Sequence, residues 1–215
     1  MRQETVNVYE FDELSPDIQQ AVIEKRRNSA DFPDWEWWYW VYEDAKAIGK
    51  LMGIDIDNIY FSGFWSQGDG ACFEGNFHYK AGCVKEVKAY APQDTELHRI
   101  AKEWSKIQRP LFYKVNGTVK HSGYYNHEYC TQINLYADGD LGDRYIEIGI
   151  DHKTEDAFSD VLRSFMRWIY SQLEAEYIHI TSDDHIREDL SANSDEFLSD
   201  GTPHYVLDGC EVETA

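Results

Sequence analysis

The sequence predicts an α+β fold in which an antiparallel sheet is packed with several helices. Alternating apolar and polar residues, typical of strands, lie at 59–79 and 111–150, and segments with helical apolar spacing lie on both sides of them. Of the 215 residues, 42% are apolar and 15% aromatic, which is enough for one large core. We therefore expect a single domain over residues 1–208, and a frayed acidic tail over residues 209–215.

The clearest single signal is a β-hairpin with its loop at residues 66–70. Aromatic and β-branched runs flank this loop, whose glycines tolerate a positive φ. Alternation along the second run places Phe73 and Phe77 on one face, which we expect to be the core face of the sheet. Gly63 and Gly75 lie inside the two runs, and we attribute them to aromatic rings that pack over them.

Two helices are predicted before the hairpin, after a short strand at 6–11. Ser15 and Pro16 supply an N-cap and a first helical residue for the first helix. Asp34 then caps a second helix, which Gly53 ends. The apolar stripe of the second helix is suited to packing on the sheet.

Two further helices and a set of strands are predicted after the hairpin. A short helix is closed by Pro92, and the next helix begins at Asp94. The Asn116-Gly117 pair predicts a tight turn between strands at 111–115 and 118–121, because both turn residues need a positive φ. Strands at 128–136 and 144–150 then extend the hairpin into a meander.

The last part of the chain is predicted to be mostly helical. Thr154 caps the longest helix, whose apolar stripe is fit to cover a sheet face. Ser182 caps a short helix, and a turn at 199–201 leads to a further apolar stretch at 205–207.

The net charge is strongly negative and is concentrated at the two ends of the chain. The sequence holds 40 acids and 20 Lys and Arg residues, a net charge of −20. Residues 1–60 have 13 acids and 6 bases, and residues 182–215 have 10 acids and a single base. Such a field repels nucleic acid and anionic lipid, and it favours a partner with a basic surface. We therefore expect no direct nucleic-acid binding.

No apolar run is as long as a membrane span, and the N-terminus opens into no signal-peptide core. We therefore expect a cytoplasmic protein with no membrane contact. The four cysteines lie far apart without a C-x-x-C pair, which argues against a zinc site and against disulfides. We predict no catalytic residue, no metal and no cofactor, with Cys72 as inert packing.

An enzymatic alternative remains open: a metal-dependent hydrolase or a small-ligand-binding domain. Its residues would be His121, His127 and the Asp151-His152 pair, because imidazoles and carboxylates relay protons and bind divalent ions. The hairpin loop would supply the ligand-binding backbone, as glycine-rich loops do, although it lacks the lysine and the following helix of a P-loop. The four loop residues in question are Gln67, Gly68, Asp69 and Gly70.

Four tryptophans fall within the six residues 35–40. Trp38 belongs to the apolar stripe of the second helix, but one stripe cannot hold all four. Trp35, Trp37 and Trp40 are therefore a candidate aromatic surface or groove.

Three segments carry a resemblance to a known group of proteins. They read FDELS at 11–15, FSGFWSQGDGACF at 61–73, and TSDD at 181–184 with EFLSDG at 196–201. The chain resembles a family of uncharacterised proteins encoded by tailed bacteriophages and prophages, some of which carry an antitoxin label. The resemblance implies a small accessory phage protein, made in the bacterial cytosol, that binds and disables a host factor.

An acidic surface can disable such a factor by imitating nucleic acid in front of a basic groove. The non-enzymatic hypothesis is thus an acidic inhibitor of a host protein, with a nucleic-acid-processing or defence component as the candidate target. The carboxylates expected to bind that partner lie near the C-terminus: Asp183, Asp184, Glu188, Asp189, Asp195 and Glu196.

Overall fold

The computed structural model describes residues 6–33, 36–137, 150–193 and 195–204. The chain divides into two compact units. The central unit is Trp38–Glu176, and the terminal unit combines Met1–Trp37 with Tyr177–Ala215. Each unit is described by itself.

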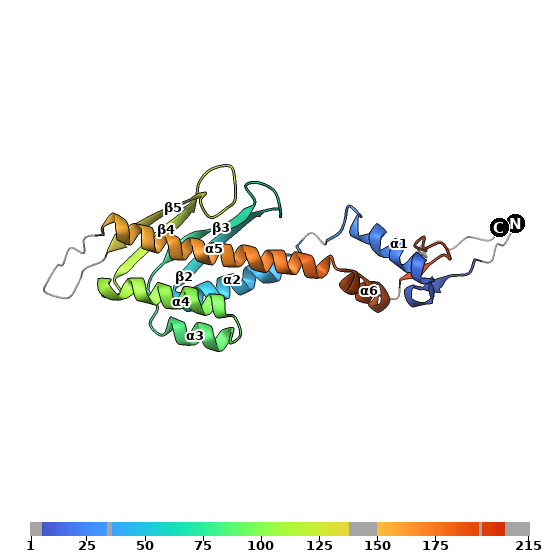
Figure 1. The fold of residues 1–215 in the computed structure, drawn as a ribbon, viewed down its shortest axis with the longest axis horizontal. Helices are drawn as coiled ribbons and strands as arrows, with labels where there is room; N and C mark the ends of the chain where they lie inside the picture. The colour runs from blue at the N-terminus through green and yellow to red at the C-terminus, as the bar shows by residue number, and fades with distance from the viewer. Residues whose placement is uncertain (1–5, 34–35, 138–149, 194, 205–215) are drawn as a thin grey trace, which may run out of the picture. The chain divides into compact units, whose positions relative to one another are not determined.

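The central unit is built on a four-stranded antiparallel sheet (Figure 1). Its strands are β2 (Ile54–Ser62), β3 (Gly70–Phe77), β4 (Val115–His121) and β5 (Thr131–Ala137). Each strand pairs with the next along the chain, so the sheet is the predicted hairpin extended into a meander. The predicted α+β class, an antiparallel sheet packed with helices, is confirmed.

Four helices belong to this region: α2 (Tyr39–Met52), α3 (Cys83–Tyr90), α4 (Thr95–Gln108) and α5 (His152–Ile180). Gly53 ends α2 in the left-handed conformation, with φ of +81°, as predicted. Asp94 caps α4, because its Oδ1 accepts a hydrogen bond from the Leu97 N–H at 2.8 Å.

The core of the central unit lies between the sheet and the helices α4 and α5. Phe77 of β3 places its ring centroid 5.4 Å from that of Trp104 on α4 and 6.2 Å from that of Phe158 on α5. Phe73 packs edge-on against Phe165 of α5 at 6.0 Å. Both β3 rings are buried, so the predicted core face is confirmed.

Asn116 and Gly117 lie inside β4 and not at a turn, so the predicted tight turn is wrong. Gly117 pairs with Phe77 on β3 and with Leu135 on β5. A side chain at this position would collide with the ring of Phe77 and the carbonyl oxygen of Asn134. Glycine serves here because neighbouring groups approach closely, not because the chain reverses.

The strand predicted at 111–115 is also absent, apart from its last residue. A 3-10 turn, η2 (Arg109–Leu111), takes its place. Phe112 and Tyr113 then have φ of +53° and +59°, a left-handed conformation that does not occur in a strand.

The predicted cause of the glycines inside the hairpin arms is wrong. Gly75 lies beside a bulge between Ile56 and Asn58, where a side chain would collide with the Asp55 carbonyl group of β2. Gly63 is exposed, and the nearest atoms to an added Cβ belong to Asp69. Backbone approach, not a covering ring, explains Gly75.

The two loop glycines have different roles. Gly68 has φ of +90°, as a turn requires, and an added Cβ would lie 3.0 Å from the Tyr125 ring. Gly70 is already the first residue of β3 and is buried. A Cβ there would lie 2.5 Å from that of His127, so Gly70 provides room and not a turn.

The terminal unit is small. It holds β1 (Tyr9–Glu10), η1 (Phe11–Glu13), α1 (Pro16–Arg27), α6 (Asp183–Ala192) and β6 (Glu196–Phe197). Strands β1 and β6 pair antiparallel. The buried residues form one apolar cluster: Phe11, Leu14, Val22, Ile23, Ile186, Leu190 and Phe197. The predicted caps lie at the predicted helix starts, since Ser15 precedes α1 and Ser182 precedes α6.

Two predicted helix starts need correction. Helix α2 begins at Tyr39, later than predicted, and its proposed cap Asp34 lies outside the described residues. Helix α5 begins at His152, and Asp151 supplies the cap that was expected from Thr154. Of the strand predicted at 144–150, all but the last residue lies outside the described residues, as do the stretch 205–207 and the tail 209–215.

We expect Phe77→Ala to lower the free energy of unfolding by about 3–5 kcal/mol, because it empties the space between α4, α5 and β4. Urea denaturation of the full chain measures this change. Tyr136→Ala, which truncates a ring that is 53% exposed on β5, serves as the control and should change stability by less than about 1 kcal/mol. Equal effects of the two substitutions would contradict the assigned core face.

We expect Gly68→Ala to destabilise the fold by about 1 kcal/mol or more, because an L-residue at this φ is strained and its Cβ meets Tyr125. Gly63→Ala in the same loop is the matched control, since an added Cβ there finds only ordinary contacts. Thermal unfolding compares them. Similar melting temperatures for the two variants would mean that the loop does not need Gly68.

Candidate functional site

One of the six C-terminal carboxylates is part of the fold. Asp183, the first residue of α6, accepts hydrogen bonds from Gln20 at 3.2 Å and from the guanidinium of Arg27, with which it forms an ion pair. These two α1 side chains hold the pKa of Asp183 below its usual range, the Gln20 hydrogen bond being the larger cause. Asp183 therefore ties α6 to α1.

The other five carboxylates carry charge that the described residues do not neutralise. Asp184 and Glu188 are exposed on α6, and Asp195 and Glu196 are exposed after it. Asp189 accepts a hydrogen bond from the Asn193 amide at 3.0 Å, a neutral donor. Within the described ranges, no Lys, Arg or His lies within 4.0 Å of any of these five carboxylates.

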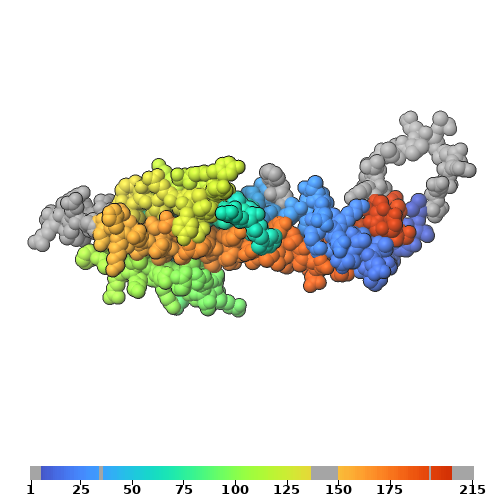
Figure 2. Space-filling model, turned by 45° about the horizontal axis from the view of Figure 1, so that its top comes forward, coloured from blue at the N-terminus to red at the C-terminus, as the bar shows by residue number. Residues whose placement is uncertain are grey.

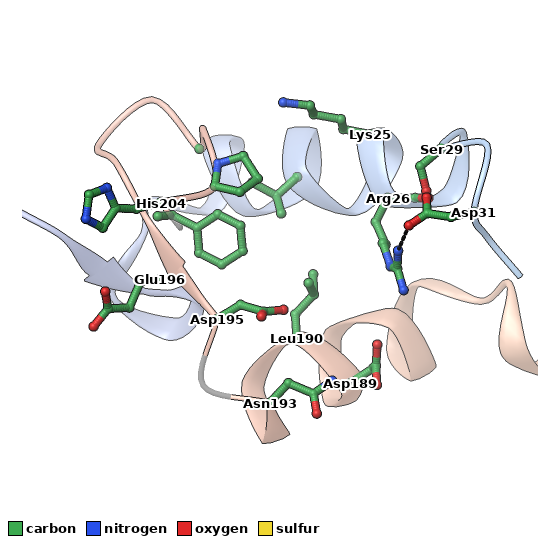
Figure 3. Close-up of a pocket in the computed structure, with 14 residues that line it drawn as sticks. Lys25, Arg26, Ser29, Asp31, Asp189, Leu190, Asn193, Asp195, Glu196 and His204 are labelled. Atoms are coloured by element: carbon green, nitrogen blue, oxygen red, sulfur yellow. Dashed lines mark hydrogen bonds and ion pairs between the residues drawn. The ribbon is translucent and has the colours of Figure 1, made fainter. Parts of the chain in front are cut away.

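Three of these acids border a pocket of about 390 Å³ between α1 and residues 189–204 of the terminal unit (Figure 3). Its apolar lining comes from Val22 on α1, Leu190 on α6 and Phe197 on β6, all of which belong to the core cluster. The returning chain is held in place because the His204 N–H donates to the Glu196 carbonyl oxygen at 2.7 Å.

The pocket has polar residues of both signs at its rim. Lys25 and Arg26 come from α1, and Figure 3 shows Asp189 and Asp195 on the C-terminal segment facing that helix. Arg26 is already paired with Asp31 at 3.4 Å, and its guanidinium lies over the ring of Phe32 at 5.1 Å. Of the lining Lys and Arg residues, Lys25 is therefore the one without a carboxylate at ion-pair distance among the described residues.

The hairpin loop at 67–70 packs against the loop that joins β4 to β5, residues 122–130. In Figure 2 the teal atoms of the first loop lie beside the yellow-green atoms of the second. The Asn126 amide of the second loop donates to the Phe61 carbonyl oxygen at 3.0 Å. The Asp69 carboxylate accepts from the Ser66 N–H at 2.7 Å and so closes its own turn. With Tyr125 over Gly68, the candidate loop residues Gln67, Gly68, Asp69 and Gly70 make a structural turn, not an open phosphate cradle.

His121 is bound into a network on the sheet. Its ring stacks on Tyr60 at 4.7 Å, and its Nε2 lies 2.9 Å from the Tyr125 carbonyl oxygen, which can only accept. Glu74 accepts from the Tyr60 hydroxyl at 2.8 Å and from the His121 N–H at 3.0 Å. The Tyr60 hydrogen bond is the main reason that the pKa of Glu74 is lowered. These groups satisfy one another.

His127 lies beside Cys130, a pair that the sequence analysis did not propose. The Sγ atom is 3.4 Å from Nε2 and 3.8 Å from Nδ1, so it faces the ring between the two nitrogens. The Tyr129 N–H donates to Nδ1 at 3.2 Å, which places the proton of the neutral ring on Nε2. In this tautomer Nε2 cannot accept the thiol proton, so His127 is not arranged as the base of a cysteine nucleophile.

The remaining candidate groups have structural roles. Asp151 accepts from the Thr154 N–H at 2.8 Å as the cap of α5, and hydrogen bonding with the side chain and then the N–H of Thr154 lowers the pKa of Asp151. His152 contacts Glu155 within the same turn at 3.0 Å. Burial raises the pKa of the Cys72 thiol to about 12, as expected of an unreactive packed cysteine.

Across the described ranges, no three His, Cys, Asp or Glu residues come close enough together to hold a metal ion. No helix in the same ranges has both the length and the apolar character of a membrane-crossing segment.

Two of the three candidate tryptophans lie in the described residues, one in each unit. Trp37 packs on Tyr177 at 5.6 Å, whereas Trp40 is 77% exposed and contacts Tyr39. Trp35 lies outside the described residues. Other exposed rings of the central unit were not among the predicted site residues, notably Tyr124, which is 92% exposed. The sequence signal for this exposed ring was Gly123-Tyr124, where the alternation of apolar and polar residues typical of a strand ends.

No curated protein and no solved structure matches the chain. Residues 37–183 match the family described as Domain of unknown function (DUF8835), a match that includes the whole of the β2–β5 sheet. The FSGFWSQGDGACF block lies inside the matched range, and the segments at 11–15 and 196–201 lie outside it. Since the match covers more than half of the chain, this protein belongs to the DUF8835 family.

Proposed function

We propose that the chain is a non-enzymatic acidic protein that binds and inhibits a basic protein of a bacterial host. The observation that supports this proposal is the excess of carboxylates in the terminal unit, which has 19 acids and 5 bases, a net charge of −14. The central unit, with 21 acids and 15 bases, has a net charge of only −6. A field concentrated in this way suits a partner that carries positive charge.

The target class follows from the same electrostatics. Proteins that process nucleic acid present basic grooves to phosphate, and exposed carboxylates can occupy such grooves in place of phosphate. The resemblance to phage-encoded proteins adds the setting: a phage accessory protein acting on a nucleic-acid-processing or defence component. Direct binding of nucleic acid or anionic lipid is disfavoured by the charge.

The hydrolase alternative receives less support from the site. His127 holds the wrong tautomer for a base beside Cys130, and Asp151 is used as a helix cap. The hairpin loop is covered by Tyr125. No specific contact favours this alternative over the binding function.

A pull-down from host lysate identifies the partner, and stopped-flow association tests the role of charge. We expect Asp184→Asn, Glu188→Gln and Asp195→Asn together to slow association about tenfold at low salt, because long-range attraction is reduced. The dependence of the on-rate on salt concentration should become flatter. Folding should change little, since all three side chains are exposed.

The control removes three exposed acids of the central unit through Asp57→Asn, Asp156→Asn and Asp160→Asn. This variant loses the same net charge and should keep most of the wild-type on-rate. If both variants slow association equally, overall charge and not the terminal face is responsible. Unchanged rates and salt slopes in the first variant would rule out the proposed acidic interface.

Asp183 should behave differently from the binding acids. Because its pKa is lowered in the folded chain, its contribution to stability is present above the unfolded pKa of about 4 and is lost as pH falls through the folded value. Asp183→Asn should therefore destabilise the protein at neutral pH and approach wild type in acid. Asp184→Asn, one residue on, should show no such convergence. Melting temperatures between pH 2 and pH 7 measure it, and parallel curves for wild type and Asp183→Asn would contradict the role of Asp183.

A further inference from the structure

We propose that the pocket of the terminal unit receives a single arginine side chain of the basic partner. This inference rests on the proposed function and adds to it a defined contact. The volume of about 390 Å³ lies at the lower end of the range for ligand pockets, so the pocket has room for one long side chain.

The shape of the pocket separates an apolar floor from a charged rim. Val22, Leu190 and Phe197 line the floor, and each is more than nine-tenths buried, so the floor is part of a fixed core. An arginine side chain has the matching division, with an aliphatic stem and a charged head. The stem would lie on the floor while the guanidinium reaches the rim.

The charge of the rim favours a cation over an anion. Arg26 and Asp31 neutralise each other at 3.4 Å. Apart from His204, whose ring is counted as neutral at pH 7, the lining residues that remain charged are Asp189, Asp195 and Glu196, opposed by Lys25. A bound anion would be repelled by three carboxylates and attracted by one lysine. A bound cation would be attracted by the three carboxylates and repelled by the lysine, a net attraction of two charges.

Arginine suits this pocket better than lysine. A guanidinium donates five N–H bonds in a plane and can bind two carboxylates at once, and it also stacks on aromatic rings. The chain already shows the same chemistry in the wall of the pocket, where Arg26 stacks on Phe32 and bonds Asp31. Acids on α6 and β6 offer an incoming guanidinium several acceptors with different directions.

The first test uses a small probe and needs no partner protein. The full chain, labelled with ¹⁵N, is titrated with N-acetyl-arginine methylamide while the amide resonances of residues 22–31 and 189–204 are followed. N-acetyl-citrulline methylamide is the control, because it keeps the shape and loses the charge. We expect saturable shifts with arginine and binding about tenfold weaker with citrulline, since hydrogen bonds to charged groups are roughly twice as strong as neutral ones.

Variants of the lining test the location. Asn193→Trp should abolish the shifts, because a ring at this exposed lining position fills the mouth without changing the charge. Ala192→Trp, at the adjacent exposed position outside the lining, should bind as wild type. Lys25→Gln should tighten arginine binding about threefold by removing a repulsive charge. Lys50→Gln in the central unit loses the same charge and should leave binding unchanged.

The inference is overturned if arginine produces no saturable shifts, if citrulline binds equally well, or if Asn193→Trp binds like Ala192→Trp. A loosening of binding in Lys25→Gln would also overturn it. Failure of the pocket is separable from failure of the proposed function. If Asn193→Trp binds the partner with the wild-type on-rate and off-rate, the pocket is not the contact, although the acidic face can still be the interface.

Discussion

The central unit depends on the contact between the ring of Phe77 and the bare backbone of Gly117. Because β4 has no side chain at that position, the Phe77 ring can lie over it and reach both Trp104 of α4 and Phe158 of α5. One ring thereby touches two helices and the neighbouring strand. Interiors are close-packed, so a change at either member of this pair would be felt by every element around it.

In the terminal unit, electrostatics decide which acids can act on a partner. Asp183 of α6 bonds Gln20 and Arg27 of α1 and so holds the two helices together. As a first-turn acid, Asp183 also complements the dipole of α6. The acids that follow it have no comparable partner in the described residues, so their mutual repulsion is a cost of the fold. The proposed basic partner would offset this cost by neutralising the exposed carboxylates.

Local signals were sufficient at several helix ends, although the cap of α5 is Asp151 and not the predicted Thr154. Gly53, Asp94 and Ser182 end or begin their helices at the predicted residues, because capping involves only groups within the same turn. The tight turn predicted at Asn116-Gly117 does not form, because pairing of β4 with β3 and β5 outweighs the local preference of this dipeptide for a turn. The pocket could not be predicted, since its walls are joined by contacts such as Arg27 to Asp183, which are 156 positions apart. The acids could therefore be predicted from the sequence, but the cavity that three of them border could not.

A net charge and a pocket contribute differently to recognition. Charge acts over a distance close to the Debye length and mainly raises the rate of encounter, with little regard for which basic protein approaches. A pocket acts only at contact and mainly slows dissociation, as buried anchors do in other interfaces.

Asp189, Asp195 and Glu196 contribute to both, because they are among the acids proposed to bind the partner and also line the pocket. An acidic protein that relied on charge alone would bind many basic proteins weakly. The apolar floor of Val22, Leu190 and Phe197 supplies a short-range contact through which one partner can be distinguished from the rest.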